Sequence, residues 1–325
     1  MSATMQQVFC VRFGDPEQAI ELRQVGIPSP APDEVLIRME YCPINPADLL
    51  LLSGRHFYKP TLPAAVGIEG TGRVEAVGSQ VTAWQPGDRV AVPFGGTWRQ
   101  WMALKATEVI PLPPDLDPQQ ASMMSVNPIT AVGLLDGIPA GSWILQNAAN
   151  SAVGQLVIRL AAQQGIHTVN IVRRPELVAE LQALGADVVV VGEEDLPARV
   201  QQATQGAAVV RGLDAVAGES SGRLYRCLSP GAELVCYGLL SSDQIILGAA
   251  DVVFGSVTIR GYTRLGVLKQ RSPESLRHLM AELSQWVQEG ILSSPIEAVF
   301  PLEQVHTAVA EAARPGRSGK ILLQL

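Results

Sequence analysis

The 325-residue sequence is poor in cysteine and shows none of the cysteine spacings that build zinc sites or disulfide frameworks. No two of its cysteines form a C-x-x-C pair. The four are Cys10, Cys42, Cys227 and Cys236. Because scattered single cysteines are typical of reduced intracellular proteins, we interpret them as free thiols and predict a cytoplasmic location.

Charged residues are also scarce, and long apolar runs are missing. Charged residues make up 17% of the sequence and hydrophobic residues 47%, which is typical of a soluble globular protein. The formal net charge of −7 argues against a nucleic acid or an anionic membrane as the main partner. Each longer apolar run is interrupted by Gly, Asp or Arg before it reaches the length that a bilayer requires.

The N-terminal segment, MSATMQQVFC, lacks the pattern of a targeting peptide. It contains no basic stretch followed by an apolar core, and the acidic Asp15 and Glu17 do not suit a transit peptide. This segment therefore adds to the expectation of a cytoplasmic protein.

The first part of the chain, residues 1–123, is rich in proline, glycine and short alternating apolar runs. Strands are predicted at residues 35–39, 72–77 and 89–93, separated by turn residues such as the Pro-Gly-Asp sequence at 86–88. This pattern predicts a compact, barrel-like β domain.

From residue 124 onward, predicted helices and strands alternate, which is typical of a doubly wound parallel sheet. One of the strands is predicted at residues 213–217. After residue 263 the pattern changes again, with an amphipathic helix at 273–289 and a closing strand at 320–325. We therefore expect an α/β protein with one domain made of 1–123 and 264–325, and a second domain, residues 124–263, for a dinucleotide.

The segment from Ser142 to Arg174 carries the strongest chemical signal. A short apolar strand is followed by the small-residue turn ANSAVG, a helical apolar repeat, and a second strand at 167–172. A strand, turn, helix and strand in this order bind the pyrophosphate of a dinucleotide at the N-terminus of the helix. The alternative is an ordinary strand-turn-helix without a ligand.

The glycine fingerprint of such sites is incomplete here, because its three positions hold Ala149, Ser151 and Gly154. Small residues still allow the backbone to approach a phosphate, and Asn150 and Ser151 offer side-chain hydrogen bonds. The predicted cofactor contacts in this turn are Ala149, Asn150, Ser151, Ala152, Val153 and Gly154.

The end of the second strand indicates which dinucleotide binds. An NAD site usually carries an acidic residue there for the ribose 2′-hydroxyl, whereas this sequence has Asn170, Arg173 and Arg174. A guanidinium group suits a 2′-phosphate, so these residues favour NADPH. The alternative is a pair of solvated surface arginines before Pro175.

Seven segments together resemble the medium-chain dehydrogenase/reductase superfamily over nearly the whole chain. They are INPADLL (44–50), LPAAVGIEGTGRVEAVG (62–78), PGDRV (86–90), GTWRQW (96–101), VNPITA (126–131), QNAANSAVGQ (146–155) and VNIVRR (169–174). The sequence is most similar to the zinc-free 2-enoyl thioester reductase branch, and next to the quinone oxidoreductase branch. The resemblance implies a GroES-like, β-rich catalytic domain and a Rossmann cofactor domain.

The resemblance also indicates whether this chain has the ligands for a zinc ion. Zinc enzymes of this superfamily have a cysteine where this chain has Asn45, and a histidine where it has Ile68, which leaves only Glu69. The four-cysteine lobe of their structural zinc is missing too. Because a tetrahedral zinc site needs thiolate or imidazole ligands, we predict no metal and interpret Cys42 as a packed residue.

The resemblance implies a catalytic tyrosine two residues after the glycine of the segment 52–63, but His56 stands there. Tyr58 follows two residues later and would face the same side of an extended segment. His56 and Tyr58 are therefore both candidate proton donors. The alternative for His56 is a surface or pocket residue without proton chemistry.

Further site residues follow from the same resemblance. Asn45 and Ile68 are expected to line the substrate cleft, with Asn45 also close to the nicotinamide ribose. Asn127 and Thr130 match a helix start that approaches the nicotinamide. Trp98, in the GTWR segment, is either a substrate contact or a packed core aromatic.

These features predict an NADPH-dependent reductase of activated C=C bonds. Hydride adds to the β-carbon of a 2-enoyl thioester, negative charge grows on the carbonyl oxygen, and a proton reaches the α-carbon. The enzyme alternative is an NADPH:quinone oxidoreductase, and the non-enzyme alternative is an NADPH-binding paralogue without catalysis. Enoyl thioesters, enones and quinones are thus the candidate substrates. The apolar run 245–259 lies where proteins that resemble this one pair sheet edges, so the resemblance implies a homodimer. The alternative is an internal strand with its flanking segments.

Overall fold

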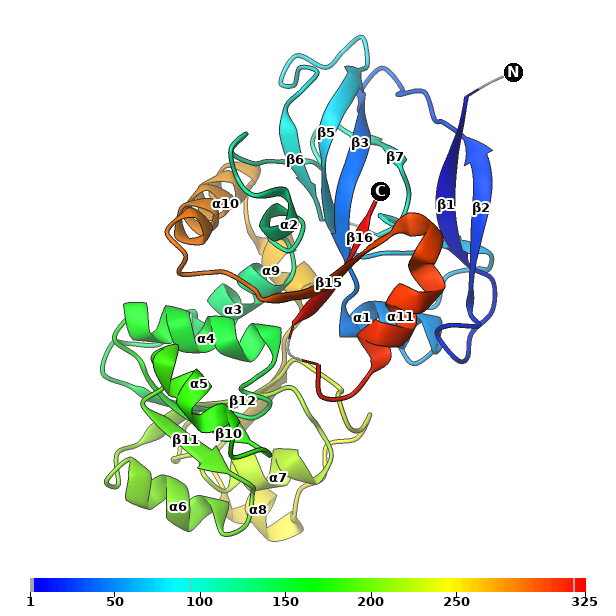
Figure 1. Ribbon diagram of the computed structural model, residues 1–325. Helices are drawn as coiled ribbons and strands as arrows, with labels where there is room; N and C mark the ends of the chain where they lie inside the picture. Colours follow the sequence, from blue (N-terminus) through cyan, green and yellow to red (C-terminus); the bar gives the residue numbers. More distant parts are fainter. Residues whose placement is uncertain (1–2, 94, 318) are drawn as a thin grey trace. The chain divides into compact units, whose positions relative to one another are not determined.

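The computed structural model describes residues 3–93, 95–317 and 319–325 (Figure 1). The chain forms two compact units. Unit 1 comprises Met1–Val126 and Ser272–Leu325, and unit 2 comprises Asn127–Arg271. Residues 264–271, which we expected in the first domain, group with unit 2 because their helix packs against the first helix of that unit.

Unit 1 is built mainly from β-strands in two sheets. The smaller sheet has the order β2-β1-β4, from β1 (Thr4–Cys10), β2 (Ile20–Gly26) and β4 (Ala64–Ala65). The larger sheet has the order β15-β16-β3-β5-β6-β8, with β7 also paired to β3. Its strands are β3 (Glu34–Pro43), β5 (Gly70–Val77), β6 (Arg89–Val92), β7 (Trp101–Lys105), β8 (Ile110–Pro111), β15 (Ile296–Pro301) and β16 (Lys320–Gln324).

Helical segments of unit 1 lie between these strands and after them. They are α1 (Pro46–Leu52), α2 (Pro118–Ala121), α10 (Pro273–Gln288), the short η1 (Leu302–Gln304) and α11 (Val305–Ala313). Helix α11 buries side chains at positions 305, 308, 309 and 312, a spacing that places them on one helical face against the core.

The end of the chain is part of the larger sheet. β16 pairs antiparallel with β3, so that Leu322 lies opposite Pro43, and the N–H of Ile44 donates to the carbonyl of Ile321 at 3.0 Å. This pairing brings the start of β16 next to the segment that follows β3. Residues near position 45 therefore meet residues near position 320.

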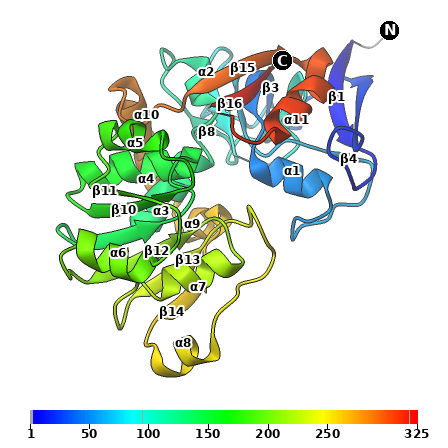
Figure 2. The same cartoon turned by 60° about the horizontal axis from the view of Figure 1, so that its bottom comes forward.

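Unit 2 is a six-stranded, fully parallel sheet in the described residues, with the order β11-β10-β9-β12-β13-β14 (Figure 2). Its strands are β9 (Trp143–Gln146), β10 (His167–Val172), β11 (Val188–Val191), β12 (Val209–Asp214), β13 (Glu233–Cys236) and β14 (Thr258–Gly261). In this order the strands run outward from β9 in both directions. The sheet is therefore doubly wound, as expected from the sequence.

Helices cover both faces of this sheet (Figures 1 and 2). Those between the first strands, α4 and α5, lie on one face, and α6 and α7 lie on the other. The helices are α3 (Asn127–Leu135), α4 (Ala152–Gln163), α5 (Leu177–Ala183), α6 (Leu196–Ala203), α7 (Glu219–Tyr225), α8 (Ala249–Phe254) and α9 (Arg264–Gln270). Within the described residues, no helix is both long and apolar enough to span a membrane.

One strand differs from its prediction. We expected a strand at 213–217, whereas β12 ends at Asp214. The Asp214 side chain accepts hydrogen bonds from the backbone N–H groups of Val216 and Ala217, at 2.9 and 3.0 Å, and Ala217 has a φ of 65°. A carboxylate that bonds the backbone two and three residues ahead turns the chain and ends the strand.

Candidate active site

The turn between β9 and α4 has the geometry of an anion site. Ser151 caps α4, and its side-chain oxygen accepts from the N–H of Gly154 at 3.1 Å. The N–H groups of Ala152 and Val153 have no hydrogen-bond partner in the described residues. Two free donors at the positive end of a twelve-residue helix suit a pyrophosphate.

Gly154 is the one fingerprint position that only glycine can fill. A Cβ atom there would lie 2.6 Å from the carbonyl oxygen of Ala149 and 2.8 Å from that of Ala148. Ala149 itself is fully buried, while Asn150, Ser151, Ala152 and Val153 are half-buried. The helix packs closely on the strand through Gly154, and the other small residues keep the turn open to a ligand.

Asn170, near the end of β10, is fully buried. It accepts from the Gln146 side chain at 2.7 Å, and it donates to the Thr168 hydroxyl at 2.8 Å and to the Val188 carbonyl at 3.1 Å. These bonds tie β10 to its two neighbouring strands. The structure therefore gives Asn170 an internal structural role and does not support the predicted direct contact with a cofactor.

The two arginines after β10 lie at the surface. Arg173 is exposed, and the Nε of the half-buried Arg174 lies 3.7 Å from a carboxylate oxygen of Glu176. An exposed ion pair of this kind contributes only about 0–1 kcal/mol, so it does not prevent Arg174 from binding another anion. Both guanidinium groups remain available for a phosphate.

Helix α3 begins with two of the predicted cofactor residues. Asn127 and Thr130 are both buried. The side-chain nitrogen of Asn127 has no hydrogen-bond partner in the part of the chain that the structure describes. A buried amide without a partner suits a ligand that brings an acceptor.

In unit 1, Asn45 is held by charged groups on both sides. Lys320 Nζ donates to Asn45 Oδ1 at 2.5 Å, and Asn45 Nδ2 donates to Glu69 Oε1 at 3.0 Å. Glu69 Oε2 in turn accepts from the backbone N–H and the hydroxyl of Ser125, at 3.1 and 3.0 Å. Each of these four residues is at most 5% exposed.

Asp48, in the first turn of α1, completes this cluster. Its carboxylate accepts from the backbone N–H of Asn45 at 2.8 Å. Burial raises the pKa of Asp48 to about 7, although the hydrogen bond from Asn45 opposes this shift. Burial also lowers the pKa of Lys320 to about 8, with Glu69 opposing it. We name Asn45, Asp48, Glu69, Ser125 and Lys320 the unit 1 cluster.

Only part of this cluster is evident in the sequence. The sequence identifies Asn45 and Glu69, but not the lysine that donates to Asn45 from 275 positions further along the chain. The available signal was a lysine at the start of the apolar strand KILLQ, where a charged residue needs a buried partner or a turn toward solvent.

The structure brings His56 and Tyr58 together in a short segment after α1. His56 Nδ1 accepts from the backbone N–H of Tyr58 at 3.1 Å. His56 is half-buried, whereas Tyr58 is 58% exposed. Because Nδ1 is occupied as an acceptor, the imidazole of His56 is left with Nε2 for any exchange of protons.

Trp98 lies fully buried in the core of unit 1. The backbone of Gly67 approaches it so closely that a Cβ there would lie 2.4 Å from the indole ring. This placement supports the packed-aromatic alternative and does not support the predicted substrate contact. Ile68, the other predicted cleft residue, is half-buried.

Groups that could hold a metal ion are missing from the residues that the structure describes, since no three His, Cys, Asp or Glu side chains are gathered for it. The thiol of Cys42 donates to the carbonyl of Thr97 at 3.1 Å, and burial raises its pKa. A thiol held protonated in this way is a poor metal ligand. The absence of a metal remains a prediction that metal analysis can test.

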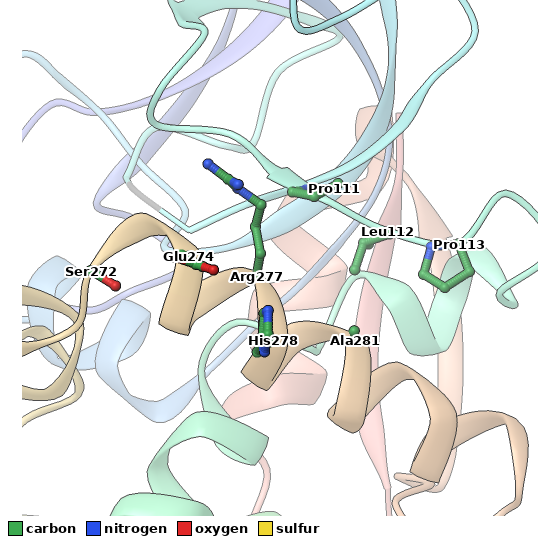
Figure 3. A pocket seen from close by; sticks show the side chains of 8 residues that line it. All are labelled: Pro111, Leu112, Pro113, Ser272, Glu274, Arg277, His278 and Ala281. Atoms are coloured by element: carbon green, nitrogen blue, oxygen red, sulfur yellow. The ribbon is translucent and has the colours of Figure 1, made fainter.

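An open surface groove of about 990 Å³ lies elsewhere on unit 1, between the segment 111–113 and α10 (Figure 3). Its helical side is lined by three exposed residues, Glu274, Arg277 and His278. None of the predicted site residues lines the groove. It is therefore separate from the candidate active site.

Sequence models of two families match the chain. The alcohol dehydrogenase GroES-like domain matches residues 31–114, and the zinc-binding dehydrogenase family matches residues 152–285. The mitochondrial enoyl-[acyl-carrier-protein] reductase of Bos taurus is 34% identical over 322 residues, which cover 96% of this chain and 86% of the relative.

Solved structures agree with these matches. The complex of Etr1p with NADP and crotonyl-CoA has a TM-score of 0.88 at 26% identity, covering 99% of this chain and 100% of the other. The quinone oxidoreductase of Pseudomonas syringae pv. Tomato DC3000 has a TM-score of 0.88 at 25% identity, with the same coverage. A GroES-like unit and a Rossmann unit with a dinucleotide turn define the class of these oxidoreductases.

The chain belongs to the zinc-free enoyl reductase branch of the medium-chain dehydrogenase/reductase superfamily. Its predicted cytoplasmic location is wrong, because the curated relatives from cattle, human, mouse and frog are named as mitochondrial enzymes. The error arose because free thiols indicate only a reducing environment and do not distinguish between reducing compartments.

Proposed function

We propose that this protein is an NADPH-dependent reductase of activated C=C bonds, with 2-enoyl thioesters as its substrates. The observation that carries the proposal is the likeness, over 96% of the chain, to a protein named enoyl-[acyl-carrier-protein] reductase. The solved relative with NADP and crotonyl-CoA supports the same cofactor and substrate class.

The residues of unit 2 fit NADPH. The N–H groups of Ala152 and Val153 would hold the pyrophosphate at the start of α4, and Arg173 and Arg174 would hold the 2′-phosphate. When bound, this cofactor supplies the hydride that adds to the β-carbon of the substrate. The chain itself binds and orients the cofactor through these groups.

The residues of unit 1 fit the other needs of the reaction. Negative charge grows on the thioester carbonyl oxygen as the hydride adds, and a buried amide N–H stabilises such a charge better than water does. Asn45 supplies that donor. His56 Nε2 and the exposed hydroxyl of Tyr58 are the two candidate donors of the proton to the α-carbon.

Quinone reduction is the second candidate. It is favoured by one observation, the histidine at position 56 in place of the tyrosine that the resemblance to enoyl reductases implies. A quinone needs no proton donor aimed at a carbon atom. A quinone reductase should therefore tolerate the His56→Ala, Tyr58→Phe double variant, whereas an enoyl reductase that uses either donor should not.

A homodimer also belongs to this proposal. β14 lies at the edge of the unit 2 sheet, and large apolar side chains are exposed around it. Val253 and Phe254 on α8 are 71% and 86% exposed. An apolar surface beside an unpaired strand edge suits a second copy related by a two-fold axis. Phe254→Asp should give monomers in sedimentation analysis, and a monomeric wild type at micromolar concentration would contradict the proposal.

The test of function is a substrate panel. Crotonyl-CoA, a simple enone and a quinone are each offered with NADPH and with NADH, and cofactor oxidation is measured. Rapid reduction of crotonyl-CoA with NADPH supports the proposal. Turnover of the quinone alone would replace it with quinone reduction, and tight NADPH binding without turnover would indicate a non-catalytic paralogue.

A further inference from the structure

The side-chain amide of Asn45 is held at both ends by groups of opposite charge. Its oxygen accepts from the ammonium group of Lys320 at 2.5 Å, and its nitrogen donates to the carboxylate of Glu69 at 3.0 Å. Both partners are almost fully buried, so water does not compete for these bonds.

This arrangement fixes which way the amide faces. Rotation by half a turn would place the NH₂ group against the ammonium group of Lys320 and the oxygen against the carboxylate of Glu69. Both charge-assisted hydrogen bonds would then be lost, and bonds of this kind are stronger than those between neutral groups. Only one orientation of Asn45 is therefore stable between Lys320 and Glu69.

The fixed orientation leaves one donor of Asn45 unused. An amide nitrogen carries two hydrogens, and the structure gives it one acceptor, Glu69, among the described residues. A buried N–H without an acceptor destabilises the protein, and a ligand that brings an acceptor removes this cost. The carbonyl oxygen of a thioester is such an acceptor.

We propose that Lys320 and Glu69 are positioning residues that lock Asn45 as a hydrogen-bond donor to the carbonyl oxygen of the substrate. This inference rests on the proposed function for the identity of the substrate. Neither Lys320 nor Glu69 touches the substrate; each acts through the amide of Asn45. The positive charge of Lys320 also polarises the amide and strengthens its N–H as a donor.

The lock depends on the charge of Lys320. The ionisable groups that act on its ammonium group are Glu69, Arg317 and Asp48. Since the pKa of Lys320 is lowered to about 8, the ammonium form gives way to the neutral amine above that pH. The charge-assisted bond to Asn45 then weakens, so the lock loosens in mildly alkaline solution.

The first test measures the NMR signals of the Asn45 side-chain amide and does not depend on catalytic turnover. The side-chain ¹⁵N–¹H signals of Asn45 are assigned by their loss in Asn45→Ser, and they are then compared in Lys320→Met, Lys320→Arg and the exposed control Lys105→Met. We expect the two amide protons to be well separated in the wild type, in Lys320→Arg and in the control. In Lys320→Met they should converge, and unchanged signals there would overturn the proposal.

The second test is kinetic. Removing the hydrogen-bond partner that orients a metal ligand typically costs about 10–100-fold in affinity or activity, and we expect a partner that orients Asn45 to act in the same way. We expect a loss of this size in kcat with crotonyl-CoA for Lys320→Met, with an unchanged Kd for NADPH and partial rescue in Lys320→Arg. The alkaline fall in kcat near pH 8 should disappear in Lys320→Met. A kcat equal to that of the wild type would overturn the proposal.

A second variant and the amide signals separate the possible failures of these tests. If Lys320→Met does not fold, Glu69→Gln takes its place in both tests, because the substitution conserves size, removes the charge and replaces one acceptor oxygen with an NH₂ group. If the wild type reduces no enoyl thioester, the proposed function fails. The amide signals still show whether Lys320 locks Asn45, so the two failures remain distinguishable.

Discussion

Each unit of this protein buries an asparagine in a cluster of polar side chains, but the two clusters are built differently. In unit 2, Asn147, Ser220 and Ser221 are buried with one buried carboxylate, Asp214, and Ser220 also donates to the half-buried Glu193 at 2.6 Å. In unit 1, Asn45 is buried with two carboxylates and one ammonium group. The first cluster is made mostly of neutral donors, whereas the second is made mostly of ions.

The hydrogen bonds of the two clusters show what each construction achieves. In unit 2, Asp214 accepts from Asn147 at 2.7 Å, from Ser221 at 2.5 Å and from two backbone N–H groups of its own turn. These bonds brace the turn after β12. In unit 1, burial shifts the pKa of Asp48 up to about 7 and that of Lys320 down to about 8. The unit 1 cluster therefore changes its charge near neutral pH.

The largest effect is expected from removing the carboxylate of the unit 2 cluster. Asp214→Ala leaves several buried donors without an acceptor, and each costs about 1–3 kcal/mol. We expect a loss of roughly 3 kcal/mol or more in the free energy of unfolding, measured with urea. The exposed Asp243→Ala is the matched control and should be nearly neutral. Equal stability of the two variants would show that Asp214 does not stabilise the turn after β12.

A loss of similar size is expected in the free energy of NADPH binding when the two surface arginines of unit 2 are removed. Arg173→Ala with Arg174→Ala should weaken NADPH binding by about 3 kcal/mol, because charge-assisted bonds to phosphate contribute about 1.5–3 kcal/mol each. NADH binding should hardly change, as titration calorimetry can show. If the wild type binds NADH as tightly as NADPH, these arginines do not select the cofactor.

The unit 1 cluster should show its ionic nature in the pH dependence of stability. Between about pH 4 and 7, Asp48 is protonated in the folded protein and ionised in the unfolded chain, so the folded state binds more protons. The free energy of unfolding should then fall as the pH rises, by at most ~1.4 kcal/mol per pH unit from this group. Asp48→Asn lacks this slope.

The measurement is the difference in unfolding free energy between Asp48→Asn and the wild type. It should increase from about pH 4 to about pH 7, where Asp48 has lost its proton in both states, and then stay level. A difference that does not depend on pH would mean that ionisation of Asp48 does not affect the free energy of unfolding.

The smallest effect is expected from a neutral member of the unit 2 cluster. Ser221→Ala removes one hydrogen bond to Asp214, while the other three donors remain. A single hydrogen bond to a charged group is worth about 1.5–3 kcal/mol at most, and the remaining bonds reduce the loss to about 1 kcal/mol. Urea unfolding measures this loss of stability. A loss equal to that of Asp214→Ala would contradict the account that four donors share the stabilisation through Asp214.

The sequence predicted unit 2 better than unit 1, for physical reasons. The strand at 167–172 was predicted at the bounds of β10, since the strand follows directly on a helix that ends near Gly165. The anion-binding turn is also local, since Ser151 caps the helix that follows it. Local patterns of this kind are visible in a single sequence.

Features that depend on tertiary contacts were not predictable in this way. The unit 1 cluster forms only because β16 pairs with β3 and brings Lys320 to Asn45. The position of Asn170 near the strand end predicts a ligand contact, but three internal hydrogen bonds occupy its side chain. The sequence is compatible with either packing or substrate contact for Trp98, and its burial in the core favours packing.

The most direct test of the central claim is the rate of NADPH oxidation with crotonyl-CoA, with the saturated thioester identified as the product. We expect one saturated thioester for each NADPH consumed, a much lower rate with NADH, and a roughly 10–100-fold lower kcat in Lys320→Met. The claim would be contradicted if NADPH binds but no saturated thioester forms, or if a quinone is reduced while crotonyl-CoA is not.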